Sequence, residues 1–258
     1  MLKKVFLLLM LIAFATSSCE AKTNKIDLYK SIIQRDKMIV GISFDSKPFG
    51  FKDPDGQIIG MEADLAREIT KRILGSKNKI VFKNVTSQDR IKTAMSDDVD
   101  MVISTMTITP QRKKIVNFSV PYFVSGQVIC VKKDSKIDSL DDLMNKKIIV
   151  IFGTTGEKNI KRFAPNALIQ GYVHNSDAIN AFKRGSADAI TTDDSLLQGF
   201  VLDNPDYTIL PKRLSTEPYG IAFKKSAQTK SLKHNIDKII SEIKNDGTIE
   251  TIKNKWIL

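Results

Sequence analysis

The 258-residue sequence predicts an α/β protein of two lobes, each a parallel-rich sheet with helices on both faces. Two observations lead to this fold class. Strand and helix signals alternate as β-α-β-α-β after residue 38, and the same order returns after residue 147. Crossover helices pack against the parallel sheet that they connect. Two such units therefore predict two sheets, with ligand sites beyond the carboxyl ends of their strands.

The first unit is read from short apolar runs and one amphipathic segment. Its strands are expected at residues 38–42, 80–82 and 99–104. Apolar side chains recur at every fourth position of residues 61–74, and Gly75 follows, which predicts a helix with a glycine end. Ser87 is the expected N-cap of the second helix.

The second unit repeats this pattern. Its strands are expected at residues 147–152, 167–169 and 188–191. One helix is expected to follow Gly156, and a second runs from an N-cap at Ser176 to Gly185. A strand at 219–223 and a mostly helical stretch at 226–258 complete the chain.

The first nineteen residues have the pattern of an export signal. Lys3 and Lys4 precede an apolar run at 5–15, which is too short to span a bilayer. Small residues then lead to Cys19, as in a lipobox, so lipidation of Cys19 and a polar tether at 20–25 are expected. The alternative is ordinary cleavage near Ser18. Either process predicts an exported protein, in the periplasm or on the outer face of the cell membrane, held there by a lipid anchor if Cys19 is acylated.

Composition argues against several other functions. The formal charge is +11, but the lysines are spread over the chain without interleaved aromatics, so no nucleic acid is expected as partner. His174 and His234 are the only histidines and lie far apart, so neither a metal site nor a catalytic triad is predicted, and no cofactor is expected. Cys130 lies in an apolar run and is expected to be an inert core thiol.

The strongest chemical signal lies at residues 105–114. A strand is expected to end near Thr105, Thr109 suits an N-cap, and Pro110 suits the first helical position. Arg112 then lies in the first turn of this helix. An arginine beside a helix N-terminus is an anion site, and its guanidinium can hold a carboxylate through two parallel hydrogen bonds.

Two further points lie in the second unit. Residues 153–156, Gly-Thr-Thr-Gly, follow a strand and open a helix, so the Thr155 and Gly156 amides can face an anion. Asp193 comes just past its strand and can neutralise an ammonium group, although helix capping by this acidic cluster is the alternative. Together with Arg112 and Thr107, these groups predict a site for a zwitterion.

The order and spacing of these motifs resemble the extracellular solute-binding proteins of family 3, the polar amino-acid receptors of ABC importers. The resemblance runs from about residue 36 to the C-terminus. Its motifs lie at residues 41–51, 60–66, 107–113, 118–122, 153–156, 188–193 and 219–222.

The resemblance implies a hinged, two-lobe periplasmic-binding-protein-like fold of type II. Lobe one would hold residues 26–126 and 218–258, and lobe two residues 127–217. The protein would be the monomeric substrate-binding component of an importer. It would capture a free L-amino acid between the lobes and deliver it to an ABC permease in the cytoplasmic membrane.

Site residues carry over by position. Arg112 would bind the α-carboxylate together with the Thr155 amide, Thr107 would contact both ends of the ligand, and the Thr105 carbonyl and Asp193 would receive the ammonium. Further positions are expected to line the pocket: Gly156, Arg90, Asp45 and Phe49.

Arg90 decides the expected ligand. It lies in a segment that resembles the glutamate, aspartate and glutamine branch, where it would reach the ligand's side chain. The sequence therefore ranks glutamate or aspartate first and glutamine second. Basic amino acids rank last, with Asp45 and Asp194 as the acids that would serve them. Two alternatives remain: a sensor module for a signalling receptor, and a cyclohexadienyl dehydratase-like enzyme on the same fold.

Overall fold

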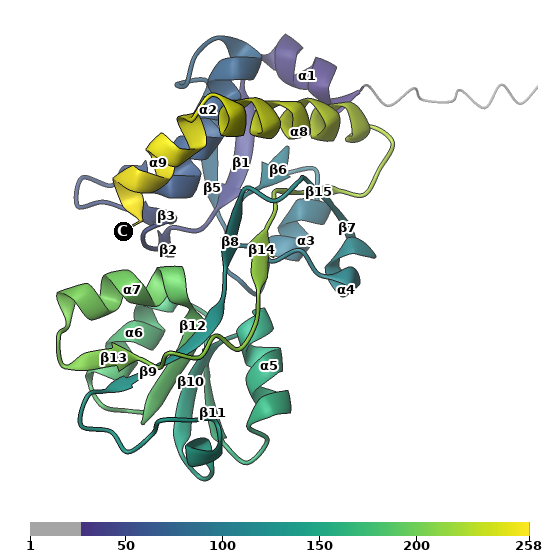
Figure 1. Cartoon of the computed structure of the whole chain (residues 1–258). Helices are drawn as coiled ribbons and strands as arrows, with labels where there is room; N and C mark the ends of the chain where they lie inside the picture. Colours follow the sequence, from purple (N-terminus) through teal and green to yellow (C-terminus); the bar gives the residue numbers. More distant parts are fainter. Residues whose placement is uncertain (1–26, 258) are drawn as a thin grey trace, which may run out of the picture.

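The computed structural model describes residues 27–257 as two lobes, each built around one five-stranded sheet (Figure 1). We call the lobe around β5-β1-β6-β15-β7 lobe one and the lobe around β11-β10-β12-β9-β13 lobe two. The expected leader, Cys19 and the tether lie outside the described residues. Within the described part, no helix is both long and apolar enough to cross a bilayer.

Lobe one holds the beginning and the end of the described chain. Its main sheet contains β1 (Met38–Ile42), β5 (Ile80–Asn84), β6 (Met101–Val102), β7 (Val116–Phe118) and β15 (Ala222–Lys224). A small sheet contains β2 (Asp45–Ser46), β3 (Gly50–Lys52) and β4 (Ile58–Ile59). The helices are α1 (Leu28–Arg35), α2 (Met61–Leu74), α3 (Arg90–Met95), α4 (Pro110–Lys113), α8 (Lys230–Asn245) and α9 (Thr248–Trp256).

Lobe two is formed by the middle of the chain. Its sheet contains β9 (Gln127–Lys132), β10 (Lys147–Ile151), β11 (Leu168–Tyr172), β12 (Ala189–Asp193) and β13 (Tyr207–Ile209). The helices are α5 (Thr155–Phe163), α6 (Asn175–Lys183) and α7 (Asp194–Asp203), with a short 3₁₀ turn at Asp141–Leu143.

Two antiparallel strands, β8 (Phe123–Ser125) and β14 (Glu217–Tyr219), join the lobes (Figure 1). β8 continues into β9, which pairs antiparallel with β12, and β14 leads to β15, which pairs antiparallel with β6. Each sheet therefore combines three parallel strands with one antiparallel strand that arrives from the other lobe, and a fifth strand, β7 or β13, pairs antiparallel with that strand. Because the described part of the chain crosses between the lobes only here, we call these two strands the hinge.

Both faces of each sheet are covered, as predicted. On β9, Val128 and Cys130 join one apolar cluster while Ile129 and Val131 join another, since successive side chains of a strand point to opposite faces. Cys130 is buried, as expected, and forms no disulfide among the described residues; burial raises the pKa of its thiol to about 12. An inert thiol follows, because the thiolate is the reactive form.

Three local expectations were wrong. Ser87 and Ser176 are not N-caps: α3 begins after Asp89 and α6 after His174, neither with a side-chain cap bond. The strand expected at 219–223 is interrupted at Gly220 and Ile221 and forms β14 and β15 instead. It divides because its first half belongs to the hinge and its second half to the sheet of lobe one.

Ile240 on α8 is fully buried in the main core of lobe one. We expect Ile240→Ala to lower the free energy of unfolding by about 2–5 kcal/mol, because it leaves a cavity. Leu202→Ala is the control, since Leu202 is 62% exposed; its effect should stay within about 0.5 kcal/mol. Urea denaturation measures both, and equal effects would contradict this assignment of the core.

Candidate ligand-binding site between the lobes

A small pocket lies between the lobes, next to the hinge. Lobe one contributes Ser87, Arg90, Thr105 and Thr107, and lobe two contributes Thr154, Thr155, Gly156, Asn175, Thr192, Asp193 and Leu196. Most of these residues follow the carboxyl ends of β6, β10, β11 and β12. The pocket therefore lies where parallel sheets bind ligands, as the sequence predicted.

Arg112 is not among the residues that line this pocket, but its guanidinium bonds to the backbone of Thr107, which does, and of Gly153, which precedes the lining residues Thr154–Gly156. Thr109 caps α4, since its hydroxyl accepts a hydrogen bond from the Arg112 amide at 3.1 Å. The buried guanidinium donates through Nη1 to the Thr107 carbonyl at 2.8 Å and through Nη2 to the Gly153 carbonyl of lobe two at 3.0 Å. Burial, followed by the nearby charge of Arg90, lowers the pKa of Arg112 to about 9. An anion beside this guanidinium would relieve both effects.

Asp193 supplies the opposite charge from lobe two. It ends β12, and its side chain makes no capping bond to α7. Instead it accepts a hydrogen bond from the Tyr219 hydroxyl of the hinge. Desolvation raises the pKa of Asp193 to about 7. A buried cation would restore its ionised form, so the site suits an ammonium group.

Asp194 has a different role from its neighbour. Its carboxylate accepts hydrogen bonds from the Ser125 hydroxyl and the Ser195 amide, both at 2.7 Å, and pairs with Arg213. It therefore ties α7 to the hinge and the strand connections of lobe two. The sequence left open whether this acidic cluster lines the pocket or has a structural role. In the structure, Asp193 lines the pocket and Asp194 makes the structural contacts.

Hydroxyl groups bridge the two lobes across the pocket. The Thr107 and Thr155 hydroxyls lie 3.5 Å apart, and Thr155 donates to Glu217 of β14 at 2.8 Å. Glu217 was not predicted as a site residue, although it lies at the predicted boundary between the lobes. No local pattern marks it, because its partner Thr155 is distant in sequence.

Arg90 lines the pocket from lobe one and is 2% exposed. Its Nη1 donates to the Ser104 carbonyl at 2.5 Å and to the Thr105 carbonyl at 3.2 Å. Behind it, buried Glu62 of α2 accepts a hydrogen bond from the Thr105 amide at 2.6 Å and another from the Tyr122 hydroxyl. Glu62 was also not predicted as a site residue. Its position, an acid on the apolar face of α2, could have indicated it from the sequence.

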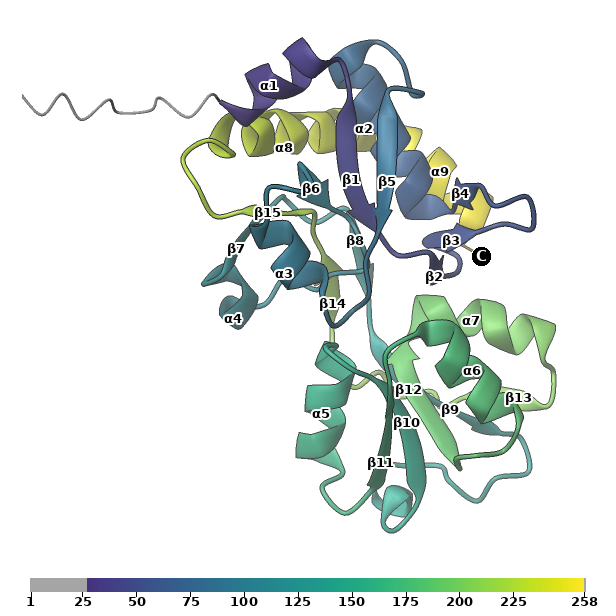
Figure 2. The same cartoon turned by 180° about the vertical axis from the view of Figure 1, so that it is seen from behind.

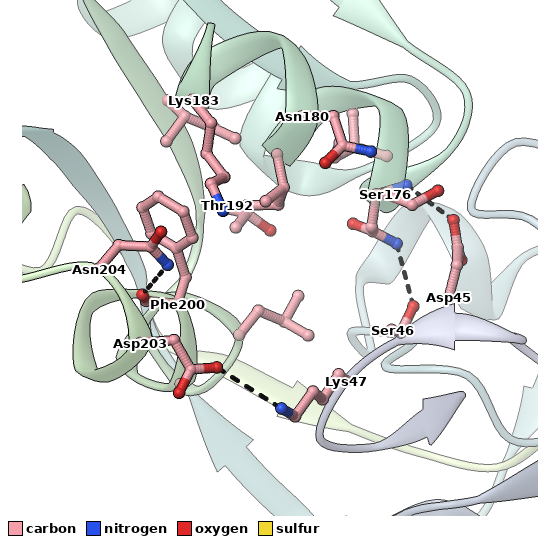
Figure 3. A pocket seen from close by; sticks show the side chains of 16 residues that line it. Asp45, Ser46, Lys47, Ser176, Asn180, Lys183, Thr192, Phe200, Asp203 and Asn204 are labelled. Atoms are coloured by element: carbon pink, nitrogen blue, oxygen red, sulfur yellow. Dashed lines mark hydrogen bonds and ion pairs between the residues drawn. The ribbon is translucent and has the colours of Figure 1, made fainter. Parts of the chain in front are cut away.

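Asp45 lies at the lobe boundary beside the pocket and is not among its lining residues. Its carboxylate accepts the Asn175 amide of lobe two at 2.9 Å, and the Asn175 side chain donates to Ser46 at 3.0 Å (Figure 3). Lys47 pairs with Asp203 at 3.6 Å. The contacts of Asn175 hold β2 against α6 (Figure 2), while the Lys47–Asp203 pair reaches α7. Together they border a larger adjoining cavity, which shares Asn175, Thr192 and Leu196 with the pocket.

Phe49 was expected to wall the pocket, but the structure places it in the core of lobe one. It is fully buried and makes edge contacts with Phe123 and Tyr219, at ring-centroid distances of 5.3 and 5.6 Å. Phe49 supports Tyr219, and Tyr219 in turn contacts Asp193. An apolar side chain suits the wall of a pocket and the core of a lobe equally, so the sequence did not distinguish these two positions for Phe49.

Known proteins are similar to this chain in both sequence and architecture. The family model for bacterial extracellular solute-binding proteins, family 3, matches residues 38–258. The chain belongs to this family. Because its members are extracellular by description, membership implies an exported protein, in the periplasm or at the cell surface.

Named relatives cover nearly the whole chain. It is 38% identical to the glutamine-binding protein GlnH of Bacillus subtilis, over 99% of this chain and 98% of that one. It is 40% identical to a glutamine-binding protein of Geobacillus stearothermophilus, over 83% of this chain and 81% of that one. An ancestral arginine-binding protein bound to glutamine is a structural neighbour, with TM-score 0.79 and 39% identity over 86% of this chain and 98% of that one.

The lobes meet closely at Gly153. This residue has φ +78°, and a Cβ atom there would lie 2.5 Å from the Ser87 carbonyl of lobe one. We expect Gly153→Ala to hold the lobes apart, giving a larger radius of gyration in small-angle X-ray scattering. Gly185→Ala is the matched control, since Gly185 has φ +73° but open space around it. Scattering by Gly153→Ala that matches this control would contradict the closure contact.

Proposed function

We propose that this protein is the substrate-binding component of an amino-acid ABC importer, which captures a free polar L-amino acid between its lobes. The observation that carries the proposal is the pair of opposite charges beside one pocket: Arg112 from lobe one and Asp193 from lobe two. An α-amino acid has a carboxylate and an ammonium on one carbon, so it can satisfy both. Leaving either charge unpaired away from water would be costly.

The remaining contacts are proposed on the same geometry. The ligand carboxylate would lie between Arg112 and the Thr155 and Gly156 amides at the N-terminus of α5, where free N–H groups favour an anion. Its ammonium would lie between Asp193, the Thr107 hydroxyl and the Thr105 carbonyl. A ligand held by groups from both lobes would stabilise the closed arrangement.

For the ligand's side chain, we propose glutamine first and glutamate or aspartate second. The sequence ranked the acidic amino acids first because of Arg90. However, Arg90 interacts electrostatically with Glu62, which reduces the charge available to a ligand. The relatives named for glutamine support this order. Asp45, the acid considered for basic ligands, is occupied by Asn175.

Delivery requires a partner in the membrane. We propose an ABC permease as this partner, a lipid anchor at Cys19, a monomeric binding protein, and the lobe boundaries near residues 126 and 217. An amino-acid sensor would use the same pocket, so permease dependence separates the two. An enzyme is not proposed: a neighbour with TM-score 0.82 and 35% identity is an ancestral amino acid-binding protein, described as a precursor of cyclohexadienyl dehydratase.

Ligand-dependent thermal unfolding tests the proposed function. Purified protein, freed of ligand by unfolding and refolding, is scanned against all common L-amino acids. Binding adds about 2.7 kcal/mol at one hundred times Kd, so we expect glutamine to raise Tm most. Arg112→Ala should abolish this shift, whereas Lys113→Ala, an exposed cation on the same helix, should retain it. No shift with any amino acid would overturn the proposal.

Binding should depend on pH through Asp193. Desolvation raises the pKa of its carboxyl to about 7, and only the ionised form pairs with ammonium. Below pH 7 binding must therefore release a proton, and Kd should rise about tenfold from pH 6 to pH 5. Between about pH 8 and 8.5 it should change little, and at higher pH binding should weaken again, because the pKa of Arg112 is about 9. Isothermal titration measures this dependence of Kd on pH. The Asp193→Asn variant should bind weakly and show no such dependence. An unchanged pH profile in this variant would exclude Asp193 as the ammonium partner.

A further inference from the structure

Beneath the pocket, lobe one contains a buried ionisable cluster of Glu62, Arg90 and Tyr122. Glu62 is fully buried in the first turn of α2, Arg90 begins α3, and Tyr122 precedes the hinge strand β8. Among the described residues, Glu62 Oε1 accepts the Thr105 amide and the Tyr122 hydroxyl, while Oε2 has no hydrogen-bond partner. The cluster therefore contains a carboxylate that is only partly satisfied.

The hydrogen-bond donors of Arg90 are likewise only partly satisfied. All of its side-chain hydrogen bonds to described residues come from Nη1, and its buried Nε has no partner among them. Glu62 and Arg90 form no hydrogen bond or ion pair with each other within the described chain, but their charges interact. Arg90 lines the pocket. Its charge is thus compensated from behind, and its Nη2 donors remain available to a ligand.

We propose that Glu62, which does not line the pocket, is a positioning residue that sets the charge Arg90 presents to the ligand's side chain and so selects glutamine over glutamate. The inference rests on the proposed function and deepens it. Glu62 also holds the Thr105 amide, so one carboxylate supports both Arg90 and the backbone segment beside the ligand's ammonium.

The selection follows from counting buried charges. With Glu62 ionised, Arg90 is balanced, and an amide oxygen can accept a hydrogen bond from Arg90 without adding charge. A ligand carboxylate there would leave two negative groups around one guanidinium, away from water. Discrimination then comes from repulsion of the wrong ligand. With Glu62 neutral, Arg90 is unbalanced and favours the carboxylate.

This choice is linked to protons. Burial raises the pKa of Glu62 to about 7, against the opposing effects of Tyr122, Thr105 and Arg90. Protonation therefore takes place near neutral pH, and lower pH favours glutamate relative to glutamine. Asp193, Tyr219 and Arg112 also lie close to Arg90. Asp193 and Arg112 meet the α-ammonium and α-carboxylate that both ligands share, so their effects cancel in the ratio of affinities.

The test is the ratio Kd(glutamate)/Kd(glutamine), measured by isothermal titration at pH 6, 7 and 8. In the unmodified protein the ratio should rise with pH, by up to about tenfold per unit where Glu62 titrates. Glu62→Gln should lower the ratio at pH 8 about tenfold or more and remove its pH dependence. Glu68→Gln, the same change on the solvent side of α2, is the matched control and should alter neither.

Three results would overturn the inference. One is a folded Glu62→Gln variant with an unchanged ratio. Another, which needs no variant, is a ratio that stays constant between pH 6 and 8. The third is tighter binding of glutamate than of glutamine at pH 8. Tyr122→Phe keeps the Glu62 carboxylate but removes one donor, so it should retain the pH dependence. Absence of binding to every amino acid would instead overturn the proposed function.

Discussion

Balance of buried charge around one small pocket is the constraint on which the arrangement of the two lobes depends. The groups concerned lie buried or half-buried at the lobe boundary: Glu62, Arg90, Arg112 and Asp193. Each is supported by hydrogen bonds from segments distant in sequence. Arg112 uses backbone carbonyls of both lobes, and Asp193 uses a hinge tyrosine. Glu62 Oε2 and Arg90 Nε have no hydrogen-bond partner among the described residues, and in the proposed function a zwitterion that bridges the lobes would complete the site.

In the proposed function, the hinge would let this balance of charge respond to the ligand. Within residues 27–257, β8 and β14 are the two strands that connect the lobes. Contacts at the boundary assist closure on both sides of the pocket, through Asn175 with Asp45 on one side and Gly153 against lobe one on the other. Hinge residues also take part in the site: Tyr219 contacts Asp193 and Glu217 contacts Thr155. The connection between lobes and the chemistry of binding are therefore built from the same strands.

In the proposed function, a layered arrangement of residues would give this site its specificity. Arg112 and Asp193 are suited to the groups that every α-amino acid shares, so they provide affinity without choosing a side chain. Arg90 lies where a side chain would reach, and Glu62 lies behind it. A carboxylate one layer from the ligand can change selectivity while the ligand's direct contacts are kept. Changes at such a position offer members of one fold a route to different amino acids.

Much of the fold was determined by the sequence itself, because local periodicity and turn chemistry reach only a few residues along the chain. The apolar spacing of α2, the Thr109-Pro110 start of α4 and the doubled β-α-β-α-β order all correspond to elements of the structure. Arg112 and Asp193 could also be singled out as candidate site residues from the sequence, since each follows the end of a predicted strand. Tertiary structure alone decided that Phe49 belongs to the core, that residues 219–223 divide between hinge and sheet, and that Glu62 lies behind Arg90. The physical reason is that burial, charge balance and pairing across the hinge arise between segments far apart in the chain, where no local pattern records them.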